Sequence, residues 1–230
     1  MSIKENLSSI QSRIAKACQK ANRNPNEVRL ITVTKTFPVN LIKEALRAGV
    51  TDIAENHVQE AEEKFPQLPN DVCHHLIGHL QTNKVRRAVE LFDWIHTIDS
   101  IKLAERVNRI AGELGRQIVV LAQVDLAKES TKTGIDESEL IDLATYLGRA
   151  ENLAFQGLMT IPPYFENPAK TVRYFRRLRE LLEDINNRPI IPNPLTELSM
   201  GMSHDFEYAI AEGATMIRVG TAIFGDRNYL

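Results

Sequence analysis

The chain has 230 residues, 43% of them hydrophobic and 25% charged, and its formal net charge is −2. This composition is that of a soluble globular protein with one well-filled core, and it gives no basic face for nucleic acid. The clustered arginines are expected to form one solvated helix face. They are Arg173, Arg176, Arg177 and Arg179.

The sequence shows neither a targeting signal nor a disulfide pattern. Its N-terminus mixes charges and lacks an apolar signal core, and no run of about eighteen apolar residues occurs. The two cysteines, Cys18 and Cys73, share no metal-ligand spacing and are too few for a disulfide framework. We therefore expect an unexported protein of the reducing cytoplasm, without a membrane partner.

The predicted elements alternate along the chain. A helical pattern of apolar residues over 3–21 comes first, and a β-branched run over 30–36 follows it. Further strands are expected at 52–55, 74–77, 94–98, 118–124, 155–159, 196–199 and 216–220. Helical spacing lies between the strands, at 41–48, 58–65, after Thr82, and at 101–114, 140–147, 172–185 and 206–211.

This alternation predicts a parallel sheet, because parallel neighbours need a crossover helix between them. Eight is also the number of strands that closes a barrel. We therefore expect residues 1–230 to form a single TIM (β/α)8 barrel in one domain. No helix is predicted after Gly220, so the N-terminal helix is expected to cover the remaining gap.

One lysine stands at the end of the first predicted strand. Lys35 follows the run 30–34, whose Ile, Thr and Val residues are typical of a buried strand. Inside a barrel, desolvation favours the neutral amine, which attacks a carbonyl carbon to form a Schiff base. The alternative is a lysine whose ammonium group extends from the strand end into solvent.

Two turns rich in small residues follow the last two strands, where barrel enzymes often bind phosphate. The first covers 198–203 and contains two serines and Gly201, which allows a close approach of the backbone before a helix begins. The second covers 218–222. Together they predict a phosphate site, while the alternative for the first turn is a simple helix cap.

Three further polar residues occupy strand ends. Asn56 follows the second strand and either contacts a ligand or caps its helix, and His79 follows the third strand. Arg218 lies in the eighth strand and shares a face with Met216 and Gly220. An inward arginine is a buried cation that needs an acceptor, in the simplest case a neighbouring carboxylate.

A metal site at His74, His75 and His79 is considered and discounted. Adjacent strand residues point to opposite faces, and no carboxylate or cysteine completes a recognisable ligand set in the sequence. We therefore predict no metal site.

A lysine and a phosphate site at one end of a barrel predict a phosphorylated carbonyl ligand, for which pyridoxal 5′-phosphate is a natural candidate. The sequence resembles the pyridoxal phosphate homeostasis protein family over nearly its whole length. The resemblance rests on an ordered set of motifs at 34–36, 55–60, 75–84, 157–163, 198–205 and 217–225. Thr34 stands where many family members carry serine.

The resemblance implies a barrel like the N-terminal domain of alanine racemase, of the pyridoxal phosphate fold type III kind. Lys35 would form the covalent aldimine with the cofactor, and Arg218 would face its pyridine nitrogen. Asn56 and His79 would line the ring, and Lys132 would lie near the pocket mouth and take part in cofactor exchange. The phosphate would be surrounded, largely by backbone amides, at Ser199, Met200, Gly201, Gly220 and Thr221.

Arg218 also argues against turnover. A guanidinium does not readily accept a proton, so beside the pyridine nitrogen it weakens the ring as an electron sink. The chain also ends soon after the eighth strand, with no further domain to supply a catalytic tyrosine.

We therefore predict a non-catalytic pyridoxal phosphate carrier or regulator that affects the balance of amino acids and keto acids. We expect a monomer, whose partners are the cofactor and the apo-enzymes that receive it. The alternatives are a barrel amino-acid racemase and a Schiff-base aldolase that uses Lys35 without a cofactor.

Overall fold

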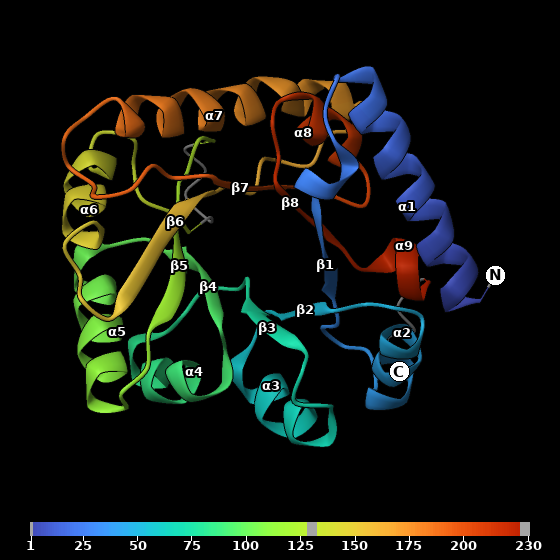
Figure 1. Ribbon diagram of the computed structural model, residues 1–230, viewed down its shortest axis with the longest axis horizontal. Coiled ribbons are helices and arrows are strands. Elements are labelled where there is room, and N and C mark those ends of the chain that lie inside the picture. Colours follow the sequence, from blue (N-terminus) through green and yellow to red (C-terminus); the bar gives the residue numbers. More distant parts are fainter. Residues whose placement is uncertain (1, 128–132, 226–230) are drawn as a thin grey trace.

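The computed structural model describes residues 2–127 and 133–225. Eight parallel strands, each hydrogen-bonded to the next and the last to the first, close into a barrel (Figure 1). The predicted (β/α)8 barrel is therefore confirmed. The strands are β1 Arg29–Val33, β2 Asp52–Glu55, β3 Cys73–Leu76, β4 Trp94–Ile98, β5 Ile118–Gln123, β6 Leu153–Met159, β7 Glu197–Met202 and β8 Met216–Val219.

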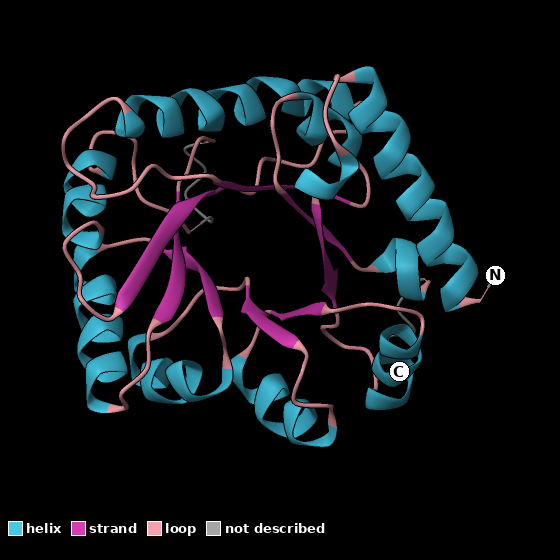
Figure 2. Ribbon diagram, viewed as in Figure 1, coloured by secondary structure: helices cyan, strands magenta, loops and turns pink. Residues whose placement is uncertain are grey.

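Helices form a ring outside the strands (Figure 2). They are α1 Ile3–Lys20, α2 Val39–Arg47, α3 Val58–Lys64, α4 Val85–Leu91, α5 Ile101–Glu113, α6 Leu140–Leu147, α7 Val172–Asn186, α8 Phe206–Ala211 and α9 Thr221–Phe224. Local signals explain where two of them begin. Ser2 and Glu5 form a capping box at α1, and the Ser100 hydroxyl accepts from the Leu103 amide at α5. None of the described helices is long and apolar enough to cross a membrane.

Two expectations at the ends of the barrel sequence are wrong, while several other strand bounds differ by one to three residues. The first strand ends at Val33 and not at Thr36, because Thr36 has a positive φ of 66°, which no extended strand contains. The expectation of no helix after Gly220 is also wrong, since the short helix α9 follows it directly. The N-terminal helix α1 packs against α9 as well as against α8 and α2, so α1 and α9 share the covering of this side of the barrel.

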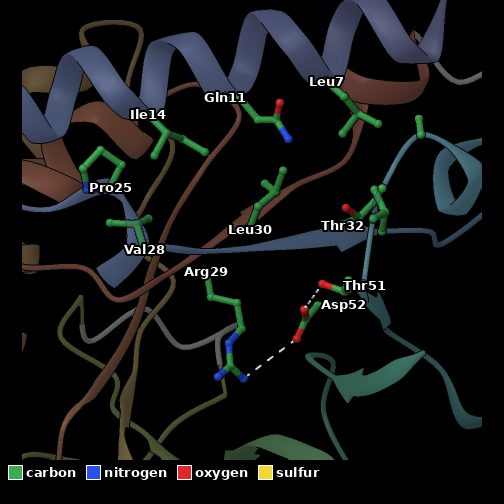
Figure 3. Close-up of a pocket in the computed structure, with 13 residues that line it drawn as sticks. Leu7, Gln11, Ile14, Pro25, Val28, Arg29, Leu30, Thr32, Thr51 and Asp52 are labelled. Carbon is green, nitrogen blue, oxygen red and sulfur yellow. Dashed lines mark hydrogen bonds and ion pairs between the residues drawn. The ribbon is translucent and has the colours of Figure 1, made fainter. Parts of the chain in front are cut away.

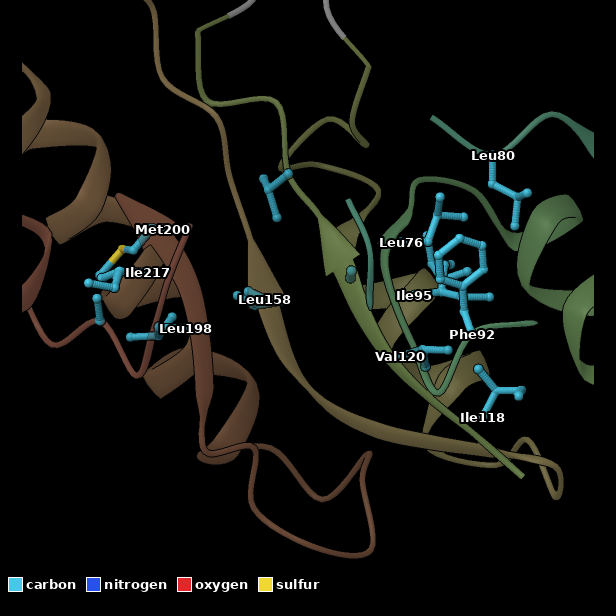
Figure 4. Close-up of a cluster of buried hydrophobic side chains, with 14 of the residues drawn as sticks. Leu76, Leu80, Phe92, Ile95, Ile118, Val120, Leu158, Leu198, Met200 and Ile217 are labelled. Carbon is cyan, nitrogen blue, oxygen red and sulfur yellow. The ribbon is translucent and has the colours of Figure 1, made fainter. Parts of the chain in front are cut away.

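The main core lies between the sheet and the helices, where every strand contributes its outward side chains. Figure 4 shows two parts of this layer, one around Phe92 and Ile95 and the other around Met200 and Ile217. A second, smaller apolar cluster fills part of the barrel interior. It consists of Ile31, Val33, Ala54, Ile77, Leu121, Met159 and Met216.

The rest of the described interior is polar. Buried inward positions are taken by Asp52, His75, His96, Ser199 and Arg218. Barrel interiors are usually filled by branched aliphatic side chains, so this composition carries a desolvation cost that the hydrogen bonds described below must offset.

The packing of α1 gives the first prediction. Ile10 is 1% exposed, and its replacement by alanine should lower the free energy of unfolding by about 2–5 kcal/mol, because it leaves a cavity under α1. Ile101→Ala is the matched control, since Ile101 is 37% exposed at the start of α5, and it should cost less than about 1 kcal/mol. Urea titrations of both variants measure the difference, and equal losses would contradict the packing of α1.

Candidate functional site

A cavity of about 300 Å³ opens at the carboxyl ends of the strands. Its residues end or follow six strands that are neighbours around the barrel mouth, β6, β7, β8, β1, β2 and β3. They are Val33, Lys35, Asn56, Ile77, Ile161, Met202, Ser203, His204, Arg218, Gly220 and Thr221. An amine, a guanidinium, an amide and two hydroxyls thus meet between apolar walls, which is typical of a small-ligand site.

Lys35 sits in a turn that is held on both sides. The Thr34 hydroxyl donates to Glu55 Oε1 at 2.7 Å, and the Ala54 carbonyl oxygen lies 3.1 Å from the same hydroxyl oxygen. The Thr36 amide donates to Glu60 Oε2 at 2.8 Å, while its backbone stays in the left-handed region that β-branched residues rarely adopt. Such a conformation persists only where neighbouring contacts impose it, and here those contacts fix the backbone that carries Lys35.

A partly buried cation joins these contacts. Lys64 Nζ donates to the Thr34 carbonyl at 3.0 Å, to Glu55 Oε1 at 2.9 Å and to Glu60 Oε2 at 2.7 Å. Burial raises the pKa of Glu55 above its usual value, even though Lys64 and Thr34 favour the charged carboxylate. Lys64 therefore supplies the positive charge that offsets the negative charges of Glu55 and Glu60 next to the turn that carries Lys35.

Removing that charge gives the second prediction. Lys64→Met should lower the free energy of unfolding by about 3 kcal/mol, because it leaves Glu55 buried without its cation. Lys102→Met, which changes an exposed lysine of α5 in the same way, should have little effect. Denaturant titrations compare the two variants, and a Lys64 loss no larger than that of Lys102 would contradict the role of the buried pair.

Arg218 forms the floor of the cavity and is 3% exposed. Its Nη1 donates to Ser199 Oγ at 2.7 Å, and its Nη2 donates to the Thr160 carbonyl at 2.9 Å. Burial lowers the pKa of Arg218 to about 10, with the charge of Asp205 acting in the opposite direction, so the guanidinium stays positive at neutral pH. The hydrogen-bond partners found among the described residues are a hydroxyl and a carbonyl, in place of the carboxylate expected in the simplest case.

The two small-residue turns converge on the other side of the cavity. Gly220 lies so close to β1 that an added Cβ would be 3.1 Å from the Val33 carbonyl oxygen. Asp205 accepts from the Met202 amide at 2.7 Å and thereby holds the turn that carries Ser203. The Ser203 and Thr221 side chains are partly or fully exposed and line the cavity, so their hydroxyls are accessible to an anion.

The structure brings together five of the residues predicted from the sequence. Lys35, Asn56, Arg218, Gly220 and Thr221 line one cavity. The helix α3 begins after His57, and no side chain caps it, so Asn56 does not serve as the alternative helix cap. Lys132 lies outside the described residues.

Four other predicted residues do not line this cavity. The Ser199 side chain lies below it against Arg218, and Met200 belongs to the outer core. Gly201, at a φ of 90°, lets the backbone approach α8, where an added Cβ would be 2.6 Å from Ala209 Cβ. His79 is exposed, and its Nδ1 lies 3.4 Å from Asp99 Oδ2.

Sequence reasoning missed Met202 and His204 as lining residues, whereas the Ser203 hydroxyl, expected in this turn, does line the cavity. The turn containing them was recognised, but the period-two alternation that places Ser199 inward fails at Gly201, where φ becomes positive. A glycine inside a strand pattern was the available signal of this change in direction.

A row of polar side chains continues from Arg218 through the barrel interior. Ser199 Oγ lies 2.9 Å from His96 Nδ1, and His96 Nε2 lies 3.0 Å from His75 Nδ1. His75 Nε2 lies 3.0 Å from Asp52 Oδ1. We call these five residues, from Arg218 to Asp52, the polar column.

Burial lowers the pKa of His75 and lowers that of His96 well below its ordinary value, with Arg218 adding to the effect on His96. Both rings are therefore neutral in the folded protein at pH 7. The unfolded chain binds protons near about pH 6.5, where these folded-state rings do not, so stability must fall as the pH drops.

The third prediction follows from this loss of stability as the pH falls. The free energy of unfolding should decrease from about pH 7.5 to about pH 5.5, as the unfolded histidines take up protons. His96→Asn removes one such group and should flatten the profile by up to about 1.4 kcal/mol per pH unit. Denaturant titrations at a series of pH values measure both slopes, and parallel profiles would contradict the neutral, buried state of His96.

At the opposite end of the barrel, Asp52, Cys73 and His75 are the one group among the described residues whose ligand atoms lie close enough to hold a metal ion. The sequence-based statement that no carboxylate or cysteine accompanies the histidines is therefore wrong, because strand register pairs Asp52 with Cys73. Burial and nearby carboxylates raise the pKa of the Cys73 thiol to about 12, and Arg29 Nη1 lies 3.8 Å from Asp52. The guanidinium of Arg29 places a positive charge beside this group, which disfavours a metal ion.

A second hollow of about 300 Å³ lies outside the barrel, between α1 and the strand β1 (Figure 3). Leu7 and Ile14 of α1 face Leu30 of β1 across it, and Arg29 and Asp52 form an ion pair at its edge. This hollow contains neither a lysine nor a small-residue turn of the predicted kind, so the cavity around Lys35 is the candidate functional site.

The fold and the site define a single (β/α)8 barrel with a lysine and a buried arginine at the carboxyl ends of its strands. The family model for the N-terminal domain of alanine racemase matches residues 6–228. The pyridoxal phosphate homeostasis protein of Haemophilus influenzae is 41% identical over 233 residues, which cover 100% of this chain and 98% of that protein. This chain belongs to the pyridoxal phosphate homeostasis protein family, as the sequence motifs predicted.

Solved structures agree with this assignment. PipY of Synechococcus elongatus with PLP bound is 42% identical, with a TM-score of 0.86 over 97% of this chain and 100% of that chain. The alanine racemase of Clostridium difficile is 16% identical, with a TM-score of 0.72 over 96% of this chain and 56% of that chain, which shows a shared fold.

Proposed function

We propose that this protein binds pyridoxal 5′-phosphate in the cavity around Lys35 and takes part in its homeostasis, by buffering or delivering it. The observation that carries the proposal is the convergence of Lys35, Arg218 and two small-residue turns on one cavity. Support also comes from PipY, whose structure with PLP bound is similar over nearly the whole chain, and from relatives named as pyridoxal phosphate homeostasis proteins.

The lining residues fit this ligand by their chemistry. When bound, pyridoxal phosphate supplies an aldehyde, an aromatic ring and a phosphate dianion. Lys35 would hold the group through its amine, since an amine condenses with an aldehyde to a C=N linkage with loss of water. Ser203 and Thr221 would hold the phosphate with their hydroxyls. Asn56 contacts the ring.

Arg218 sets the limit on reactivity. Its guanidinium donates hydrogen bonds and does not accept a proton, so beside the ring nitrogen of a bound cofactor it would keep that nitrogen unprotonated. An unprotonated ring is a weak electron sink, which disfavours the carbanion chemistry of racemases. The relatives carry the name of homeostasis proteins and no enzyme name, which supports a carrier or regulator.

We further propose that the protein acts as a monomer in the cytoplasm and passes the cofactor to apo-enzymes. Cys18 and Cys73 are free thiols, which fits a reducing compartment. Half-exposed lining residues such as Lys35 and Ser203 leave the cavity open to exchange.

The fourth prediction tests this function. Wild-type protein mixed with pyridoxal phosphate should show a visible absorption band, and borohydride treatment should fix a mass adduct on Lys35. Lys35→Ala should lose both, because no amine remains to attack the aldehyde. Lys102→Ala should keep both, since it changes an exposed lysine of α5.

The outcome that would refute the proposal is a wild-type protein without the band and without the adduct. Turnover of amino acids in a screen of the loaded protein would instead favour a racemase. Cleavage of an aldol substrate by protein freed of cofactor would favour the Schiff-base aldolase.

A further inference from the structure

We propose that His96, His75 and Asp52 are positioning residues for Arg218, because the polar column fixes the direction in which the Ser199 hydroxyl bonds. The inference rests on the proposed function for what Arg218 does to a cofactor, but the column itself belongs to the protein alone. None of the positioning residues lines the cavity, so they act on it only through Ser199 and Arg218.

The direction of the hydrogen bonds in the polar column is set first at Asp52, the end near the amino ends of the strands. Burial would raise the pKa of Asp52, but hydrogen bonds from His75 and Thr51 outweigh it and keep the carboxylate charged. A carboxylate only accepts, so His75 Nε2 must carry a proton and donate. Since the ring of His75 is neutral, its Nδ1 has no proton and must accept from His96 Nε2.

The same reasoning passes upward through His96. Its Nε2 carries the single proton of a neutral ring, so its Nδ1 accepts, and the group within reach is the Ser199 hydroxyl at 2.9 Å. The Ser199 proton is thereby directed toward His96. The lone pairs of Ser199 Oγ are then turned toward Arg218 Nη1, which lies 2.7 Å away.

Arg218, at the other end of the column, requires the same hydrogen-bond direction independently of Asp52. An arginine only donates, so Ser199 must accept from Arg218 whatever the rest of the column does. One end of the column is a group without acceptors and the other a group without donors, and all four hydrogen bonds between them run from Arg218 toward Asp52. A reversal at either histidine would direct a second N–H toward Ser199 and disturb the acceptor of Arg218.

The surroundings of the column make it rigid. Ser199, His75 and His96 are fully buried, and the Thr51 hydroxyl donates to Asp52 Oδ2 at 2.6 Å. Figure 3 shows Asp52 between Thr51 and Arg29 at the amino end of the barrel. With no exposed member between its ends, a break in the column leaves a buried donor or acceptor unpaired, which is costly.

The fifth prediction concerns the ring protons of the free protein. Two-bond ¹H–¹⁵N correlation spectra at pH 7 should show His75 and His96 each protonated at Nε2 alone. Asp52→Asn keeps the shape of the side chain but removes the charge, so the Nδ1-protonated form of both rings should appear. Asp93→Asn is the matched control, because Asp93 lies at the same end of the barrel, bonds to the His74 amide and is outside the column.

The same variants are then tested for cofactor binding. Asp52→Asn should weaken the binding of pyridoxal phosphate about tenfold and shift the absorption maximum of the loaded protein, while Asp93→Asn should do neither. A single Nδ1-protonated or doubly protonated His96 in the wild type would overturn the proposal. So would Asp52→Asn spectra and affinity equal to those of Asp93→Asn.

A pair of substitutions at His96 tests the link to Ser199 without relying on Asp52. The amide oxygen of His96→Asn can replace Nδ1 and accept from Ser199, whereas the longer side chain of His96→Gln replaces Nε2 and does not. His96→Asn should therefore bind the cofactor within about threefold of wild type, and His96→Gln about tenfold more weakly. Equal affinities would overturn the positioning role.

Failure of the proposed function is recognised separately. A wild-type protein that binds no pyridoxal phosphate refutes that function, while the ring spectra of the free protein still decide the direction of the column.

Discussion

The hydrogen bond from Arg218 to Ser199 is the interaction on which the rest of the site depends. A guanidinium buried inside a barrel pays a large desolvation cost, which only well-placed acceptors offset. The Thr160 carbonyl supplies one acceptor and the Ser199 hydroxyl the other. A hydroxyl is a dependable acceptor only when its own proton is engaged elsewhere, and this explains why the barrel interior below it contains histidines where aliphatic side chains are usual.

The lysine turn is supported by a second, separate set of charges. Glu55 and Glu60 bind the two threonines that flank Lys35, and Lys64 balances both acids. These contacts lie outside the polar column, on the helix α3 and the end of β2. The backbone around Lys35 is thus held by contacts from β2 and α3, and Arg218 by contacts inside the barrel, so each can be changed by substitution without directly breaking the support of the other.

Local patterns were enough to predict the barrel, because each strand and helix carries its own signal. The strand 52–55 and the strand 94–98 were predicted with the bounds that β2 and β4 have. The helix α9 was missed because four residues show no helical period. The position of Ser203 and the meeting of Asp52, Cys73 and His75 depend on a left-handed glycine and on strand register, which are properties of the closed sheet and not of any one segment.

The polar column also separates positive from negative charge along the barrel. A positive group lies at the carboxyl end of the strands and a negative group near the amino end, joined by hydrogen bonds that all point the same way. A phosphorylated ligand at the carboxyl end meets the positive end of this arrangement, which favours its binding. Arg218, the same positive group, only donates hydrogen bonds and so offers no acceptor for a protonated aromatic nitrogen. On the proposed function, the group that would strengthen cofactor binding would therefore also suppress electron withdrawal by the ring, which suits a protein that holds a reactive cofactor without turnover.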